Sequence, residues 1–129
     1  MMDERIYHVW FGTKSRIAAL QGDIEHDVKE LFTEIARQTG VGLMELETSV
    51  DHVHLLVRVP PDRTLSSVMH QLKGASSRAI LLKYPDIKMD TGKHAFWQKS
   101  YSYRRIDAAD LPAVRSYVKS QDRRPLRHG

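Results

Sequence analysis

The chain has 129 residues, of which 41% are hydrophobic and 28% charged, with a formal net charge of +4 at pH 7 and no cysteine. These values are typical of one compact domain spanning residues 1–129, and they exclude a disordered chain, a disulfide framework and a thiolate metal site. No apolar run approaches the roughly 20 residues of a membrane span, and Asp3 and Glu4 stand where a signal peptide is basic, so we expect a cytoplasmic protein without membrane contact.

The apolar pattern predicts alternating strands and helices. Residues 6–11 predict a strand, 23–39 a helix capped by Asp23 and Gly40, and 43–50 and 52–59 two strands joined tightly. A second helix begins after Thr64 and ends near Tyr84, because Pro85 disfavours helical geometry before it. Short extended pieces follow at 95–97 and 101–103, and a third helix runs from a cap at Asp110 to about residue 121.

This order of elements predicts an α+β fold. The tight strand connections indicate an antiparallel sheet with helices packed on one face, close to the split βαβ arrangement of ferredoxin-like and RRM-like domains. The third helix is additional to that arrangement.

Two histidines in the strand over 52–59 are candidate metal ligands. Side chains alternate along a strand, so His52 and His54 share one face while Val53, Leu55 and Val57 take the core face. Two imidazoles side by side can share a divalent cation, or they can be two polar residues on an outer sheet face. Asp51 can orient a ligating imidazole or simply close the turn, and we interpret His8 and His94 as sheet or loop histidines rather than ligands.

The third helix carries a second pair of candidates. Tyr117 and Gln121 are four residues apart and share one side of the helix. A phenol is a nucleophile in covalent catalysis and an amide oxygen is a ligand for Mg²⁺ or Mn²⁺, although an edge tyrosine beside an exposed glutamine fits the same spacing. Tyr101 and Tyr103 are rival nucleophiles without a ligand at helical spacing.

Several motifs in the same order resemble the small single-tyrosine HUH transposases of bacterial insertion sequences, the IS200-like family. They cover about residues 6–122, and their matches are Thr13-Lys14-Ser15-Arg16, Asp51-His52-Val53-His54-Leu55-Leu56, Leu72-Lys73-Gly74-Ala75-Ser76-Ser77-Arg78, Phe96-Trp97 with Ser100-Tyr101, and Tyr117-Val118-Lys119-Ser120-Gln121. The chain departs from the family pattern at Ser15, at Ser49-Val50 and over 103–106.

The resemblance implies a transposase that cuts and rejoins single-stranded DNA with hairpin ends. It gives Tyr117 the role of nucleophile, forming a 5′-phosphotyrosine, and His52, His54 and Gln121 the role of ligands to Mg²⁺ or Mn²⁺. It also implies a homodimer in which the tyrosine helix of one subunit serves the histidines of the other.

Basic residues indicate where DNA binds. Residues 99–129 carry 8 Lys and Arg against 3 Asp, whereas residues 1–98 are nearly neutral, which is typical of a polyanion-binding surface or of a solvated basic tail. We expect phosphate contacts from Lys73, Arg78, Arg104, Arg105, Lys119 and Arg123. Two alternatives stay open: a nucleic-acid-binding module that no longer cleaves, and a nuclease in which metal-bound water attacks.

Overall fold

The computed structural model describes residues 5–87 and 95–120 and confirms the predicted order of elements. The elements are β1 (Arg5–Gly12), the 3-10 turn η1 (Lys14–Arg16), α1 (Gly22–Thr39), β2 (Gly42–Thr48), β3 (His52–Val59), α2 (Leu65–Lys83), β4 (Ser102–Ile106), the 3-10 turn η2 (Ala108–Asp110) and α4 (Leu111–Lys119). The extended piece predicted over 95–97 does not form a regular strand, but within it Trp97 makes an isolated β-bridge with Thr13.

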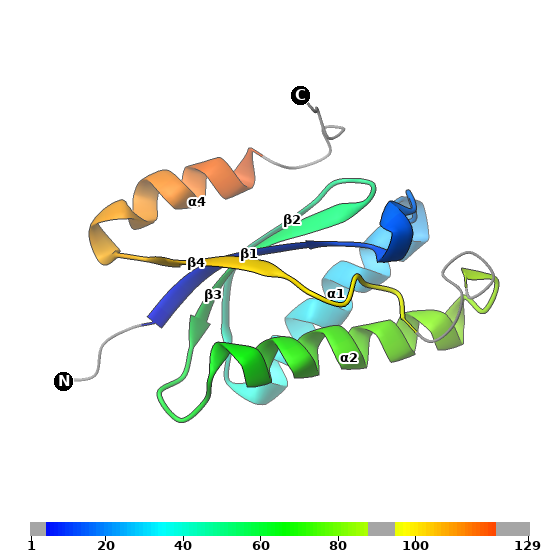
Figure 1. Ribbon diagram of the computed structural model, residues 1–129, viewed down its shortest axis with the longest axis horizontal. Helices are drawn as coiled ribbons and strands as arrows, with labels where there is room; N and C mark the ends of the chain where they lie inside the picture. Colours follow the sequence, from blue (N-terminus) through cyan, green and yellow to red (C-terminus); the bar gives the residue numbers. More distant parts are fainter. Residues whose placement is uncertain (1–4, 88–94, 121–129) are drawn as a thin grey trace.

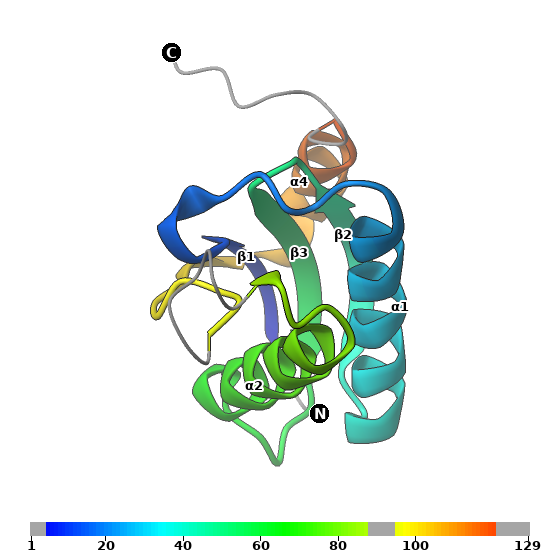
Figure 2. The ribbon, with the colours of Figure 1, turned by 90° about the vertical axis from the view of Figure 1, so that its right-hand side faces the viewer.

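The four strands form one antiparallel sheet in the order β2-β3-β1-β4. This is the strand order of a ferredoxin-like domain, so the predicted fold class is confirmed. Helices α1 and α2 lie side by side on one face of the sheet, and α4 lies across the other face (Figures 1 and 2).

Each face of the sheet has its own hydrophobic cluster. The larger cluster joins the sheet to α1 and α2 through fully buried side chains that include Val9, Leu55, Phe32 and Met69. The smaller cluster joins it to α4 and contains Ile6, Leu56, Ile106, Val114 and Val118. The run His52–Val59 therefore supplies both cores, since alternate residues of β3 face opposite sides.

The ends of the helices follow the predictions only in part. Thr64 caps α2 by accepting a hydrogen bond from the Ser67 amide at 3.1 Å, and Gly40 ends α1 with a φ of 78°. Of the other two predicted caps, the one at Asp23 is wrong and the one at Asp110 is confirmed in position only. Gln21 holds the N-cap position of α1, so Asp23 acts within the first turn, where its charge suits the helix dipole. Asp110 holds the N-cap position of α4, but it has helical dihedrals and its side chain makes no capping hydrogen bond.

No helix within residues 5–87 and 95–120 is long and apolar enough to cross a membrane.

Candidate active site

The two histidines of β3 lie on one face, as the alternation predicted. The ring centroids of His52 and His54 are 5.2 Å apart, and each residue is only 7% exposed. This face is not an open outer surface, because α4 packs on it and Trp10 of β1 lies opposite His54 in the strand register. The pair is therefore a partly enclosed site rather than two solvated side chains.

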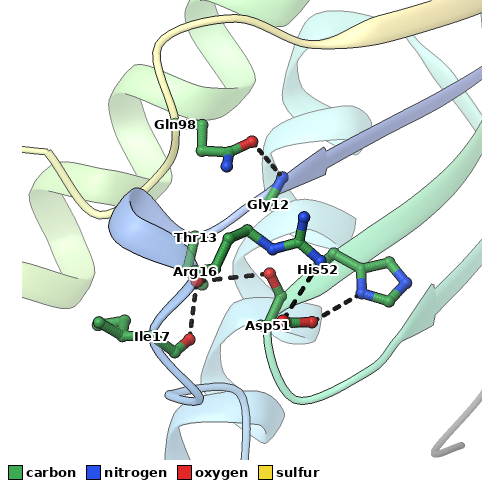
Figure 3. A network of polar contacts seen from close by, with 7 residues as sticks. All are labelled: Gly12, Thr13, Arg16, Ile17, Asp51, His52 and Gln98. Carbon is green, nitrogen blue, oxygen red and sulfur yellow. Dashed lines mark hydrogen bonds and ion pairs between the residues drawn. The ribbon is translucent and has the colours of Figure 1, made fainter. Parts of the chain in front are cut away.

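Asp51 orients the His52 ring (Figure 3). The Nδ1 atom of His52 lies 2.9 Å from Asp51 Oδ1, and the other carboxylate oxygen lies 3.3 Å from Arg16 Nη2. Burial raises the pKa of Asp51, but the hydrogen bonds from His52 and Arg16 and the charge of Arg16 outweigh it and hold that pKa below its usual value. The ionised carboxylate accepts a hydrogen bond from the Nδ1–H group of His52, so Nε2 of that ring keeps a free lone pair.

Arg16 reaches Asp51 through an unusual backbone path. Ser15 and Arg16 have φ angles of 58° and 53°, a left-handed conformation that costs about 1–3 kcal/mol for each such residue. At Gly12, an added Cβ would lie 2.7 Å from Arg16 Cδ and 3.2 Å from the Asp51 carbonyl oxygen. The close approach of Arg16 to the end of β1 therefore needs a glycine at position 12.

His8 is the functional candidate that the sequence analysis missed. It lies on β1 and is 4% exposed, and its Nε2 atom lies 3.0 Å from Nδ1 of His54. Burial, with a smaller contribution from Arg104, lowers the pKa of His8 to about 4, while burial and the neighbouring His8 and His52 lower the pKa of His54 to about 3. Both rings are thus neutral near pH 7, and His8 Nε2 can accept a hydrogen bond from the Nδ1–H group of His54.

The Tyr117 ring lies next to His8 and His54. Its ring centroid is 5.9 Å from that of His8 and 6.2 Å from that of His54, all within one chain, and the residue is 52% exposed. Val114 and Val118 anchor the helix on the sheet, and Arg115 of α4 pairs with Glu45 of β2. The anchoring fixes the helix while the Tyr117 ring stays accessible.

A hollow of about 400 Å³ brings the candidates together. Its walls include His52, His54, Tyr117 and Arg16, together with Gln98, Ser100, Tyr101 and Ser102. The predicted ligand Gln121 lies outside the described residues. Of the rival nucleophiles, Tyr101 lines the hollow, whereas Tyr103 lies opposite Val9 in the register, on the α1 and α2 face of the sheet.

The predicted DNA contacts are spread over the molecule. Arg104 lies opposite His8 in the register, whereas the ammonium group of Lys119 on α4 lies 3.9 Å from the carboxylate of Glu45 on β2. Arg105 lies opposite Tyr7 on the other face of the sheet, and Arg78 is exposed on α2. The ammonium group of Lys73 donates hydrogen bonds to the backbone carbonyl oxygens of Gln98 and Ser100. Arg123 lies outside the described residues.

Known proteins share both the sequence pattern and the fold. The family model described as "Transposase IS200 like" matches residues 2–121. The chain is 30% identical over 115 residues to the ISDra2 transposase TnpA of Deinococcus radiodurans, a match that spans 89% of this chain and 82% of the relative. It is also 30% identical to the transposase for insertion sequence element IS200 of Salmonella typhimurium, over 89% of this chain and 75% of the relative.

Two solved structures resemble this fold. One is a protein from Deinococcus radiodurans described as a transposase, with a TM-score of 0.76 and 27% identity over 96% of this chain and 95% of that chain. The other, described as a REP-associated tyrosine transposase bound to a REP hairpin, has a TM-score of 0.64 and 13% identity over 91% of this chain and 66% of that chain. The second likeness shows the fold alone.

Proposed function

The chain belongs to the IS200-like transposase family, and from this premise we propose that it cuts and rejoins single-stranded DNA at insertion-sequence ends through a covalent bond to Tyr117. The observation that carries the proposal is the placement of the accessible Tyr117 ring beside His54 in one hollow. A phenol next to a pair of imidazoles supplies a nucleophile and ligands for a cation, which are the groups that phosphoryl transfer to a tyrosine needs.

In the proposed reaction the Tyr117 oxygen attacks the scissile phosphorus. A bond from phosphorus to the phenolic oxygen forms while the bond from phosphorus to the 3′-oxygen breaks. The phenol loses its proton, and the departing 3′-oxygen takes one up to become a hydroxyl. The products are a 5′-phosphotyrosine and a free 3′-hydroxyl. Because one phosphodiester is exchanged for another, a 3′-hydroxyl of a second strand can reverse the step without a nucleotide cofactor.

We propose that Mg²⁺ or Mn²⁺ binds at the Nε2 atoms of His52 and His54, with Gln121 as a third ligand. The residues fit such an ion because both Nδ1 atoms are engaged, by Asp51 and by His8, which leaves both Nε2 lone pairs free. The bound cation would polarise the scissile phosphate and offset the charge that develops there. The low pKa values of His8 and His54 keep these rings unprotonated near neutral pH.

The proposed substrate is single-stranded DNA with hairpin ends, and the basic residues placed to contact it at the site are Arg16, which lines the hollow, and Arg104, which lies opposite His8. The structural relative described as bound to a REP hairpin supports a folded DNA partner. Tyr117 lies beside His8 and His54 of its own chain in this structure. A homodimer stays a prediction.

The proposal is tested by incubating the protein with labelled single-stranded hairpin DNA and Mn²⁺ and then denaturing it in SDS. We expect a labelled protein–DNA adduct that fully paired DNA and EDTA-treated samples do not give. Binding that weakens steeply with salt but leaves no adduct would indicate the non-cleaving module instead. Cut DNA that accumulates without any adduct would indicate attack by water.

Asp51→Asn is expected to weaken Mn²⁺ binding about tenfold, because the neutral amide orients the His52 ring less firmly and loses the ion pair with Arg16. Calorimetric titration with Mn²⁺ measures this without DNA. Glu30→Gln is the matched control, since Glu30 pairs with the exposed His26 on α1. Equal affinity in Asp51→Asn and the control would contradict the role of Asp51.

His8→Phe is expected to weaken Mn²⁺ binding by about tenfold to a hundredfold. The phenyl ring fills the same space but cannot accept a hydrogen bond from the Nδ1–H group of His54. The His54 imidazole therefore loses the contact that fixes its tautomer. The ¹⁵N chemical shifts of His54 report the tautomer directly. His26→Phe, at an exposed position of α1, is the control. Unchanged His54 shifts in His8→Phe would rule out this role for His8.

A further inference from the structure

The segment from Phe96 to Ser100 contributes Gln98 and Ser100 to the wall of the hollow, although it has no regular strand or helix of its own. On one side it is tied to the end of β1. The Lys14 amide donates to the Phe96 carbonyl and the Gln98 amide to the Gly12 carbonyl, both at 2.9 Å. The Gln98 side chain completes this link by accepting from the Gly12 amide at 3.3 Å (Figure 3).

On its other side the segment is held by three residues of α2. Ser77 Oγ accepts from the Phe96 amide at 2.8 Å, and Ser76 Oγ accepts from the Trp97 indole at 2.9 Å. Lys73 lies one turn earlier on the same helix face. Both serines are buried. We refer to Lys73, Ser76 and Ser77 as the α2 clamp.

Lys73 makes the most contacts of the α2 clamp. Its ammonium nitrogen lies 2.7, 3.3 and 2.9 Å from the carbonyl oxygens of Gln98, Lys99 and Ser100. An ammonium group has three hydrogens, so these three carbonyl oxygens can use all of them. The same nitrogen lies over the rings of Phe11 and Tyr101, 4.9 and 5.5 Å from their centroids. Burial lowers the pKa of Lys73 to about 8, which agrees with a cation withdrawn from water.

We propose that Lys73 is a positioning residue which, with Ser76 and Ser77, fixes the Phe96–Ser100 wall of the candidate active site, and that it is not one of the DNA phosphate contacts. This reverses the expectation from the sequence, where Lys73 was grouped with the phosphate-binding residues. It also explains the spacing of the motif over 72–78, since positions 73, 76 and 77 recur on one face of a helix. A role of this segment in DNA cleavage rests on the proposed function. The role of Lys73 in holding the segment in place does not.

Two measurements on Lys73→Gln test the proposal. In the protein without DNA, amide hydrogen exchange at Gln98 is expected to rise about tenfold, because the carbonyl bonds that hold the segment are lost. In DNA binding, the dependence of log Kd on log salt is expected to keep its slope, whereas loss of one phosphate contact would make the slope shallower by about one. Unchanged exchange at Gln98, or a shallower slope, would overturn the proposal.

Lys73→Arg separates the two roles. An arginine replaces a lysine at a phosphate, but its planar guanidinium cannot aim three donors at carbonyl oxygens that converge on one point. We expect this variant to show the faster Gln98 exchange of Lys73→Gln; exchange like the unmodified protein would overturn the proposal.

Ser76→Ala covers the case in which both Lys73 variants fail to fold. It removes the acceptor of the Trp97 indole proton, together with the hydroxyl that donates to the Leu72 carbonyl within α2, and is expected to shift the indole proton's NMR signal and to speed exchange at Gln98. Exchange at Gln98 that stays unchanged in Ser76→Ala would count against the α2 clamp. Arg78→Gln, at an exposed position of α2, is the charge control for the exchange measurement alone, and it is expected to leave exchange at Gln98 unchanged. The exchange readout needs neither metal nor DNA, so it holds even if the protein does not cleave.

Discussion

We expect Tyr117→Phe to abolish the covalent protein–DNA adduct and to leave DNA binding unchanged, which is the largest effect among the predictions. The substitution deletes one oxygen atom from a ring that is 52% exposed, so the hydrophobic anchor of α4 at Val114 and Val118 is retained. Removing the nucleophile of a covalent mechanism lowers the rate by on the order of 10⁴-fold or more. The measurement is the SDS-stable adduct with labelled hairpin DNA in Mn²⁺.

The other two tyrosines provide matched controls. Tyr103→Phe changes an exposed residue on the α1 and α2 face of the sheet and is expected to form the adduct at the normal rate. Tyr101→Phe alters a residue that lines the hollow, so it tests the rival nucleophile directly. An adduct that survives in Tyr117→Phe and disappears in Tyr101→Phe would transfer the assignment to Tyr101.

His54→Ala is expected to remove measurable Mn²⁺ binding and to lower the rate of DNA cleavage on the order of 10³-fold. His54 is the centre of the cluster, since it contacts His8, lies beside His52 and faces the Tyr117 ring. Truncating a residue that is 7% exposed also leaves a cavity, so a lower melting temperature is expected in the same variant. Calorimetry with Mn²⁺ and the adduct assay together measure the two losses.

A second variant separates the metal effect from the packing effect. His54→Phe fills the cavity with an aromatic ring but offers no nitrogen, so it is expected to bind no Mn²⁺ while it regains part of the melting temperature. His70→Ala, at an exposed position of α2, is the control for a histidine outside the cluster. Normal Mn²⁺ affinity in His54→Phe would show that the ion binds elsewhere.

The fold was predictable because its signals are local. Alternation along 52–59 predicted strand β3 and placed His52 and His54 on one face, and both are confirmed. Thr64 and Gly40 marked helix ends through backbone chemistry that depends on a few neighbours. Asp23 does not cap α1, and Asp110 holds the N-cap position of α4 without a side-chain capping bond, because the chain path before each helix also decides which side chain reaches the first free amides.

The surroundings of the histidines were not predictable in the same way. His8 and His54 are 46 positions apart, and only the register of β1 against β3 brings their ring nitrogens to 3.0 Å. The sequence shows that His8 is in a strand, but not which strand lies beside it or which face is covered. His8 could have been identified by predicting that β1 pairs with β3. Alternation of side chains from Ile6 to Trp10 would then have placed His8 on the same face of the sheet as His54.

By itself, the sequence determined the strands and helices, the shared face of His52 and His54 and the resemblance to a transposase family, because these depend on residue type and short spacing along the chain. The tertiary structure alone decided that α4 covers the second face of the sheet, that His8 and Asp51 hold the two imidazoles, and that Lys73 binds a wall of the hollow. Apart from the contact between Asp51 and its neighbour His52, these contacts join segments far apart in the chain. Their geometry depends on strand register and helix packing, which a one-residue shift would change entirely.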